Sequence, residues 1–564
     1  MGLLDLPPEL LDLIIDRTAP DGLESFVLSC KTVYGRAASQ IRQHNDMRKT
    51  WSHTTNMSRT RRGDTLAILH DISRDPIIAE YIETLSLWDH RQDDEMPDDT
   101  TPHSFREDEQ EMENIRDLLR RAEYYADADE EEWWGRILEE DRAGDQSNMD
   151  KLYATVALLS LLPNLKTLQL PDRWHEVREG EGAEALVSNV QSLVAMSNAS
   201  GHRQKPLARL ETLLPFVEEG YDVRVGLQCL APFMTLNSIR NIYAVSCVAV
   251  DEDWGGVPFN WLNPNVKSPL TRVEFAYCCM DATGLSAFLT NTPALQVFKY
   301  SHQTKWDGLE HDWNAGEMIE ALANYNSDTI VDLAITIDEL HGEIVNGLSS
   351  FLRFTRLQKL EVDVECFCGP PLESGQRQGR DAHIPAGART WGHVDIPCMG
   401  DMLPESMREL HVNTNFPEPS EESLRALFKN IVVRRKDKLI NLHTAIIRQY
   451  GSSSAGKIAE SHDVILEVFG ADGDNLLPRS MMPLWKREFN NLFNEEVRSL
   501  SITDDVFKSL RNYLIDGGGG RGPYDYRKRL WGEVPAGLRY AYLQHRVKKQ
   551  GAKRSLFAHL FIPV

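Results

Sequence analysis

Short apolar runs recur along the middle of the chain, and several of them share one form. An apolar stretch with helical spacing leads through a short turn into a run in which apolar and polar residues alternate. This form occurs at residues 157–170, 285–300 and 348–362. Apolar spacing of three and four residues indicates a helix, whereas alternation indicates a half-buried strand. We therefore predict that helices and strands alternate through this region.

The spacing of these runs predicts a repeat architecture. Further strand-like runs lie at residues 82–87, 210–213, 239–243, 270–275, 330–335 and 407–412. We take Ile239, Leu270, Leu295, Ile330 and Leu357 as equivalent positions. They are separated by steps of 31, 25, 35 and 27 residues. Such steps are those of leucine-rich repeats with insertions. Each repeat would add one strand to a concave parallel sheet and one helix to its convex side, and neighbours would stack. An ordinary α/β domain is the alternative.

The first fifty residues predict three short helices with apolar sides. Pro7 and Pro8 suit the first turn of a helix. Asp21 is a candidate cap for the second helix, and residues 31–43 predict the third. Helices this short cannot bury their apolar faces on one another alone, so a partner surface is needed, in the rest of this chain or in another protein. The residues that require it are Leu6, Leu10, Ile14, Leu23 and Phe26.

These N-terminal residues resemble an F-box. The resemblance is carried by Leu6-Pro7-x-Glu9-Leu10, Ile14-Ile15, Leu23-x-x-Phe26 and Leu28-Ser29-Cys30-Lys31, in that order, within about the first 45 residues. Tyr34 stands where the family often has tryptophan or phenylalanine. The resemblance implies binding to a Skp-type adaptor, and through it to a cullin and a RING protein. The adaptor-binding residues that it implies are Leu6, Pro7, Glu9, Leu10, Ile14, Leu23, Phe26 and Cys30.

The repeat region is similar to the degenerate repeat domain that commonly follows an F-box in fungal proteins. Together, the two resemblances imply the substrate-recognition subunit of a Skp–cullin–F-box ubiquitin ligase, whose repeats hold an unidentified target protein. Such a chain is not an enzyme. The alternative is a scaffold outside the ligase, or a repeat protein whose N-terminal helices only cap the solenoid. Burial of Leu10, Ile14 and Phe26 against the first repeats would favour the cap.

The expected fold class is α/β, with a three-helix F-box followed by an irregular leucine-rich-repeat-like solenoid. The expected regions are an F-box at 1–50, linker helices and a first repeat at 51–90, an acidic helical insertion at 91–150, the solenoid at 151–450 with a loop insertion at about 366–400, and C-terminal repeats or a cap with a basic tail at 451–564. Acidic runs are usually solvated, so we expect the insertion to be a solvated element rather than a docking site for a basic ligand.

Composition limits the classes of partner. The net charge of −24 argues against nonspecific binding to nucleic acid or to acidic membranes, because both are polyanions. No run of eighteen apolar residues occurs, so we expect no membrane span. The N-terminus does not have the form of a signal peptide. We expect a protein of the cytoplasm, the nucleus or both.

The sequence predicts no catalytic, cofactor or metal site. The candidates for a zinc site are Cys366, Cys368, His383, His393 and Cys398. Two cysteines one residue apart hold one tetrahedral ion less readily than a C-x-x-C pair, so we interpret this stretch as a loop. No nucleophile elbow, phosphate-binding loop or H-E-x-x-H motif occurs. We expect a flexible linker at residues 517–522. The basic and aromatic residues at 524–554 predict either a site for an anionic ligand or a complement to the acidic insertion of the same chain, and we favour the second interpretation.

Overall fold

The computed structural model forms two compact units, one of residues 1–174 and 179–211 and the other of residues 175–178 and 212–564. The residues that it describes are 6–56, 64–87, 104–126, 129–142, 152–174, 183–199, 205–217, 219–251, 256–305, 312–414, 421–450, 455–462, 464–469, 483–486 and 488–489. Among these residues, no helix has the length and apolar character needed to cross a membrane.

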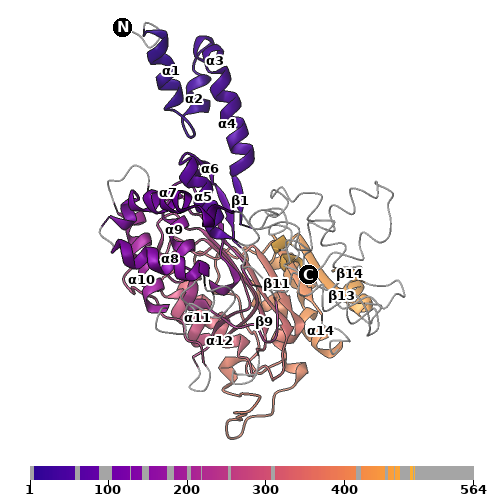
Figure 1. Cartoon of the computed structure of the whole chain (residues 1–564). Coiled ribbons are helices and arrows are strands. Elements are labelled where there is room, and N and C mark those ends of the chain that lie inside the picture. Colours follow the sequence, from indigo (N-terminus) through magenta and orange to yellow (C-terminus); the bar gives the residue numbers. More distant parts are fainter. Residues whose placement is uncertain are drawn as a thin grey trace, which may run out of the picture. The chain divides into compact units, whose positions relative to one another are not determined.

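The first unit begins with four helices (Figure 1). They are α1 (Pro8–Asp16), α2 (Leu23–Val27), α3 (Lys31–Arg36) and α4 (Ala38–Trp51). Pro8 occupies the first turn of α1, as its missing N–H permits. The prediction of one helix over residues 31–43 is wrong, because the chain breaks between α3 and α4 at Ala37. The predicted cap is also wrong: Gly22 precedes α2, and Asp21 instead pairs with Arg209 at 2.7 Å.

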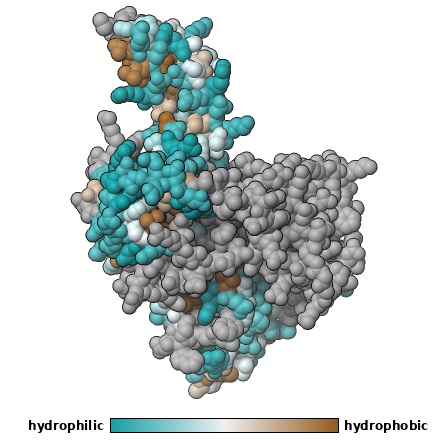
Figure 2. All heavy atoms as spheres, in the orientation of Figure 1, coloured by the Kyte–Doolittle hydropathy of each residue, from teal (hydrophilic) through white to brown (hydrophobic). Residues whose placement is uncertain are grey.

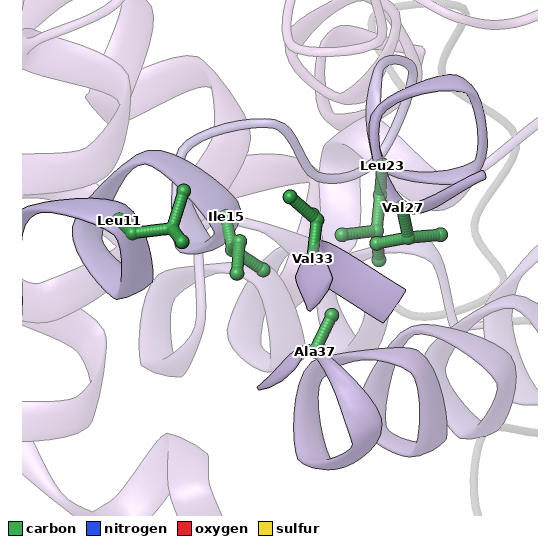
Figure 3. Packing of buried hydrophobic residues seen from close by; sticks show 6 residues of the cluster. All are labelled: Leu11, Ile15, Leu23, Val27, Val33 and Ala37. Carbon is green, nitrogen blue, oxygen red and sulfur yellow. The ribbon is translucent and has the colours of Figure 1, made fainter. Parts of the chain in front are cut away.

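These helices have a small core of their own. Six apolar side chains from α1, α2, α3 and the start of α4 point toward one another (Figure 3), namely Leu11, Ile15, Leu23, Val27, Val33 and Ala37. None of them is more than 5% exposed. Of the five residues expected to need a partner surface, Leu23 is instead buried in this core, so that expectation is wrong for Leu23.

The rest of the first unit contains three parallel strands and the helices around them. The elements are β1 (His53–Thr55), α5 (Thr65–Arg74), α6 (Ile78–Tyr81), β2 (Thr84–Ser86), η2 (Ser104–Glu107), α7 (Glu109–Arg120), η3 (Glu123–Tyr125), α8 (Glu130–Arg142), α9 (Tyr153–Leu159), β3 (Thr167–Gln169) and α10 (Ala183–Asn198). Thr54, Leu85 and Leu168 lie in register across β1, β2 and β3. In the acidic stretch, α7 packs on α5 and α8 packs on α9, while Arg116 and Glu130 join α7 to α8 at 2.5 Å.

The second unit contains a long parallel ladder in the order β4-β6-β8-β9-β10-β11-β12-β13-β14. Its strands are β4 (Thr212–Leu214), β6 (Asn241–Val245), β8 (Arg272–Met280), β9 (Val297–Gln303), β10 (Asp332–Glu339), β11 (Lys359–Asp363), β12 (Glu409–Asn413), β13 (Thr444–Tyr450) and β14 (Ile465–Phe469). A small ladder of β5 (Val225–Gly226) and β7 (Cys247–Ala249) joins the end of β8.

Helices and turns connect these strands. They are η5 (Leu227–Leu230), η6 (Phe233–Thr235), α11 (Ala282–Leu289), α12 (Ala315–Asn326), η7 (Val364–Phe367), η8 (Leu372–Ser374), η9 (His393–Asp395), α13 (Met399–Met402), α14 (Glu421–Phe428), α15 (Ile431–Asp437) and α16 (Ala455–Ser461). Helices α11 and α12 pack on each other beside the strands (Figure 1). Parallel strands need such crossovers. The helix predicted at the start of the 348–362 run is absent, because residues 348–351 have no regular secondary structure and residues 352–353 form a turn.

The register confirms the predicted repeat alignment. One buried apolar residue per strand forms a row across the second unit, and the row consists of Leu213, Ile242, Val273, Phe298, Leu333, Leu360, Leu410 and Ala445. The five positions taken as equivalent each lie three residues before a member of this row, as Ile239 lies before Ile242. The chain thus has a parallel, α/β solenoid-like fold.

Candidate protein-interaction surfaces

The N-terminal helices leave a group of large apolar side chains uncovered. Leu10 and Leu13 of α1 are 48% and 49% exposed, Leu28 after α2 is 74% exposed, and Tyr34 of α3 is 55% exposed. Helical spacing explains the two on α1, because Leu11 and Ile15 face the core and leave Leu10 and Leu13 to other sides of the helix. Figure 2 shows hydrophobic residues on this surface. We call Leu10, Leu13, Leu28 and Tyr34 the N-terminal apolar patch.

The eight residues predicted to bind the adaptor are divided between surface and core. Pro7, Glu9 and Leu10 are exposed. Leu6, Ile14, Phe26 and Cys30 are half-buried.

Leu23 is the exception among the eight, because it is 1% exposed and lies in the core of the helices. Its side chain packs in that core and is not part of the exposed surface of the helices. The predicted set omits Leu13, Leu28 and Tyr34. Helical spacing places Leu13 three residues after Leu10 on α1, which is a signal for its inclusion. Leu28 belongs to the F-box-like segment Leu28-Ser29-Cys30-Lys31.

Charged pairs tie the helices together beside the patch. Arg36 of α3 contacts Asp12 of α1 at 2.7 Å, and Arg48 of α4 contacts Glu24 of α2 at 2.8 Å. The hydrogen bond from Arg36 lowers the pKa of Asp12. Cys30 caps α3, since its Sγ accepts the N–H of Val33 at 3.5 Å. The patch therefore lies on helices that pack on a common core, with exposed ion pairs between them.

A second surface is the sheet face opposite the apolar row of the second unit. Side chains alternate along a strand, so the residues between the buried apolar ones share the other face. One such row consists of Tyr243, Glu274, Lys299, Ala334, Glu361 and His411, and the next includes Ser301, Thr336, Asp363, Asn413 and Arg448. We call these two rows the polar strand face.

Charged groups on the polar strand face are buried and paired. Lys299, 4% exposed, lies 3.9 Å from the Glu274 carboxylate, and burial raises the pKa of Glu274. Arg448 Nη1 lies 3.2 Å from Glu361 Oε1, with both side chains almost completely buried. Burial also raises the pKa of Asp363 to about 8. Buried charges require such partners, so this face is held by directional contacts.

The comparison with known families decides what this ladder is. A family model for the leucine-rich repeat domain matches residues 56–361, slightly more than half of the 564 residues. The chain belongs to the leucine-rich repeat family. No curated protein matches the sequence. The match includes strands β2 to β10 and the first part of β11, and it leaves α1 to α4 and β1 outside. The parallel ladder continues beyond the match through β12, β13 and β14. Leucine-rich repeat domains generally bind proteins, which indicates a protein-interaction module.

The candidate zinc ligands do not form a metal centre within the described part of the leucine-rich repeat protein. No group of three or more histidine, cysteine, aspartate or glutamate side chains there could hold an ion. Cys368 Sγ and His393 Nδ1 instead lie 3.8 Å and 2.9 Å from the same Ser423 hydroxyl. Burial raises the pKa of Cys368 to about 11, so its thiol stays protonated at neutral pH and is a poor nucleophile.

A cavity of about 650 Å³ lies in the loop region of the leucine-rich repeat domain, with Asp312, His341, Arg377 and Trp391 in its wall. Asp312 serves the loops themselves, because its carboxylate accepts the N–H of Glu343 at 2.9 Å and of Arg380 at 2.5 Å. This arrangement fixes backbone and indicates no reaction. The predicted linker at 517–522 and the basic residues at 524–554 lie outside the described residues.

Proposed function

We propose that this chain is the substrate-recognition subunit of a Skp–cullin–F-box type ubiquitin ligase. Its N-terminal helices bind a Skp-type adaptor, which links to a cullin and a RING protein, and its leucine-rich repeat domain holds the target. The chain carries out no bond chemistry in this role. It brings the target close to the conjugating enzyme, so that an encounter between two molecules becomes effectively intramolecular.

The N-terminal apolar patch is the observation that carries this proposal. Contiguous apolar surface on a soluble protein marks contact with another molecule. Leu10 and Leu28 belong to the residues that resemble the F-box motif, and they are 48% and 74% exposed. The motif supplies the order of these residues in the chain, and the packing of the helices supplies their exposure.

The cap alternative requires that the first repeats cover the same residues. Leu10 is exposed, and Phe26 is half-buried against the core of the helices themselves. This placement favours a separate partner over a cap. A scaffold outside the ligase would bind the adaptor in the same way. It would differ only in that the adaptor-bound chain would not recruit the cullin.

The proposal is tested with the full chain and purified Skp-type adaptor. Leu10→Asp combined with Leu28→Asp places two charges in the patch, and we expect at least a hundredfold loss of affinity because a buried unpaired charge is strongly unfavourable. Leu352→Asp is the matched control, since Leu352 of the repeat domain is 49% exposed. Unchanged affinity in the double variant contradicts adaptor binding by this patch.

The ligase step needs a separate readout. The adaptor-bound chain is mixed with a cullin and its RING partner, and co-elution in size-exclusion chromatography is measured. We expect one complex that contains all components. Adaptor binding without cullin recruitment would support the scaffold instead.

A further inference from the structure

A short segment of the chain lies on the polar strand face, far in sequence from the strands that it contacts. Residues 483–486 and 488–489 are described there, and Lys486 N–H bonds to Pro483 O at 3.1 Å to form a turn. Trp485, Lys486 and Phe489 are 1%, 1% and 4% exposed. Three large side chains of this short segment are thus buried on the strand face.

The backbone of this turn is held by one carboxylate of β11. Glu361 Oε1 accepts the N–H of Leu484 at 2.6 Å, and Glu361 Oε2 accepts the N–H of Trp485 at 3.0 Å. The indole Nε1 of Trp485 donates to Thr336 Oγ1 of β10 at 3.2 Å. Hydrogen bonds to an ionised group are the stronger ones, so Glu361 both orients the turn and fixes its position along the sheet.

The ammonium group of Lys486 occupies a site made of a carboxylate and an aromatic ring. Its Nζ lies 2.5 Å from Asp338 Oδ1 and 3.1 Å from the centre of the Tyr277 ring. The other oxygen of Asp338 accepts the hydroxyl of Ser301 at 2.5 Å, which holds the carboxylate in place. A carboxylate beside a ring face is a suitable site for a cation.

The strand backbone is distorted at this cation site. Tyr277 has φ 57°, in the left-handed region that a bulky residue rarely adopts. The register between β8 and β9 shifts between Phe275 and Cys278, which places Tyr277 in a bulge. Strained backbone clusters at active sites, ligand clamps and switch regions, and bulges are over-represented at sheet edges and beside active sites. The left-handed conformation recurs at Ser246, with φ 55°, which is the equivalent position of the preceding strand. The distortion therefore extends over two neighbouring strands of this face.

The contacts of this segment combine directed polar bonds with aromatic packing. The two backbone N–H groups, the indole N–H and the ammonium group each meet a directed polar partner. Glu488 stays 63% exposed, yet it lies 3.5 Å from the buried Lys299. Phe489 adds an aromatic contact with Tyr243, with ring centres 5.8 Å apart. A peptide of another protein could make every one of these contacts, because they use backbone groups, two aromatic side chains and one cation.

We propose that the polar strand face from β6 to β11 is a peptide-binding site and that the segment of residues 483–486 and 488–489 is its internal ligand. The partner that it fits is a protein segment with a tryptophan followed by lysine or arginine and a second aromatic residue four positions after the tryptophan. A segment on the same chain acts at a high effective concentration, so the site is closed to such a partner until this segment leaves. The inference concerns the leucine-rich repeat domain and does not rest on adaptor binding.

The first test asks whether the emptied site binds the segment from outside. The probe is a fluorescein-labelled synthetic peptide with the sequence of residues 480–491, and the receptor is the full chain with Trp485→Ala and Lys486→Ala. We expect saturable binding, at least tenfold tighter than to the unmodified chain. A peptide with the same two substitutions and a receptor that also carries Asp338→Asn serve as controls and should bind at least tenfold more weakly. A folded receptor variant with no saturable binding overturns the proposal.

A second test keeps the segment intact and does not depend on that variant. Trypsin cleaves after Lys486 only when this residue leaves its site, so the cleavage rate, measured by mass spectrometry, reports release. We expect Asp338→Asn to raise this rate at least tenfold, because the ammonium group loses its carboxylate. Asp328→Asn is the matched control, since Asp328 is exposed just before β10. Equal cleavage rates in Asp338→Asn and the unmodified chain overturn the proposal.

Discussion

The N-terminal apolar patch and the polar strand face have opposite relations between chemistry and burial. On the patch, Leu10 and Leu28 are exposed although they are apolar. On the strand face, Glu361 and Arg448 are buried although they are charged. Exposed apolar groups and buried polar groups are the two informative departures from ordinary packing. The comparison separates an apolar surface that this chain leaves uncovered from a polar surface that residues 483–486 and 488–489 of the same chain contact.

The two surfaces also differ in how contact is specified. The free energy gained by burying apolar surface is roughly proportional to the area removed from water, and it does not depend on direction. The bonds from Glu361, Thr336 and Asp338 to the segment of residues 483–486 and 488–489 are directional and require particular partner groups. We therefore expect substitutions on the patch to change affinity for a partner, and substitutions on the strand face to change both stability and the hold on the segment.

The largest effect is expected for Glu361→Ala. This change removes the carboxylate that accepts from Leu484 N, Trp485 N and Arg448 Nη1. Breaking a buried ion pair by removing one partner costs about 3–5 kcal/mol. The free energy of unfolding, measured by urea denaturation with circular dichroism, should fall by that amount. Glu361→Gln keeps an acceptor, so its free energy of unfolding should fall by less. A loss under about 1 kcal/mol in the alanine variant would contradict the contacts described for this face.

A somewhat smaller effect separates the core of the N-terminal helices from their surface. Ile15 is 0% exposed, and Ile15→Ala should lower the free energy of unfolding by about 3 kcal/mol through lost burial and a cavity. Leu28→Ala, at a residue that is 74% exposed, should change it by no more than about 0.5 kcal/mol. Equal losses in the two variants would mean that Leu28 is covered by this chain, and the patch would not exist.

The pH dependence of stability sharpens the contrast further. The pKa of Asp363 is raised to about 8 by burial, with Glu361 and Asp338 nearby, although the N–H of Ile337 and Asn413 oppose the shift. Between pH 4 and 8 the folded state then binds more protons at this group than the unfolded state. Stability should therefore fall as pH rises through this window, by at most about 1.4 kcal/mol per pH unit. Asp363→Asn should flatten the profile of unfolding free energy against pH, and an unchanged slope would contradict the shift.

The smallest effect is expected at an exposed pair. Arg209 contacts Asp21 at 2.7 Å, with side chains about half exposed. Exposed ion pairs contribute less than about 1 kcal/mol, so Arg209→Ala should barely change the midpoint of urea denaturation. A loss of unfolding free energy as large as that of Glu361→Ala would contradict the expected difference between exposed and buried ion pairs.

The sequence predicts the repeat register well because the signal is a spacing that recurs. Ile239, Leu270 and Leu295 lead into strands that are in register, and their alignment needs no knowledge of contacts. The break at Ala37 and the absence of a helix at residues 348–353 are not predicted, because apolar spacing alone continues through both.

The polar strand face could not be predicted for a different reason. Glu361 and Asp338 resemble any exposed strand residues in the sequence, and each bonds to a segment that is distant in the sequence. Leu484 is 123 residues from Glu361, so no local pattern links the two. The exposure of Leu28 is likewise a result of packing, since its apolar character alone predicts burial.

Hydrogen exchange measured by mass spectrometry on the full chain, with and without a Skp-type adaptor, tests most directly whether the N-terminal apolar patch receives a separate protein. Slower exchange in residues 8–36 on addition of the adaptor, with unchanged exchange in β8 to β12, is the predicted result. Slower exchange in β8 to β12 alone, or no change in either region, would contradict it.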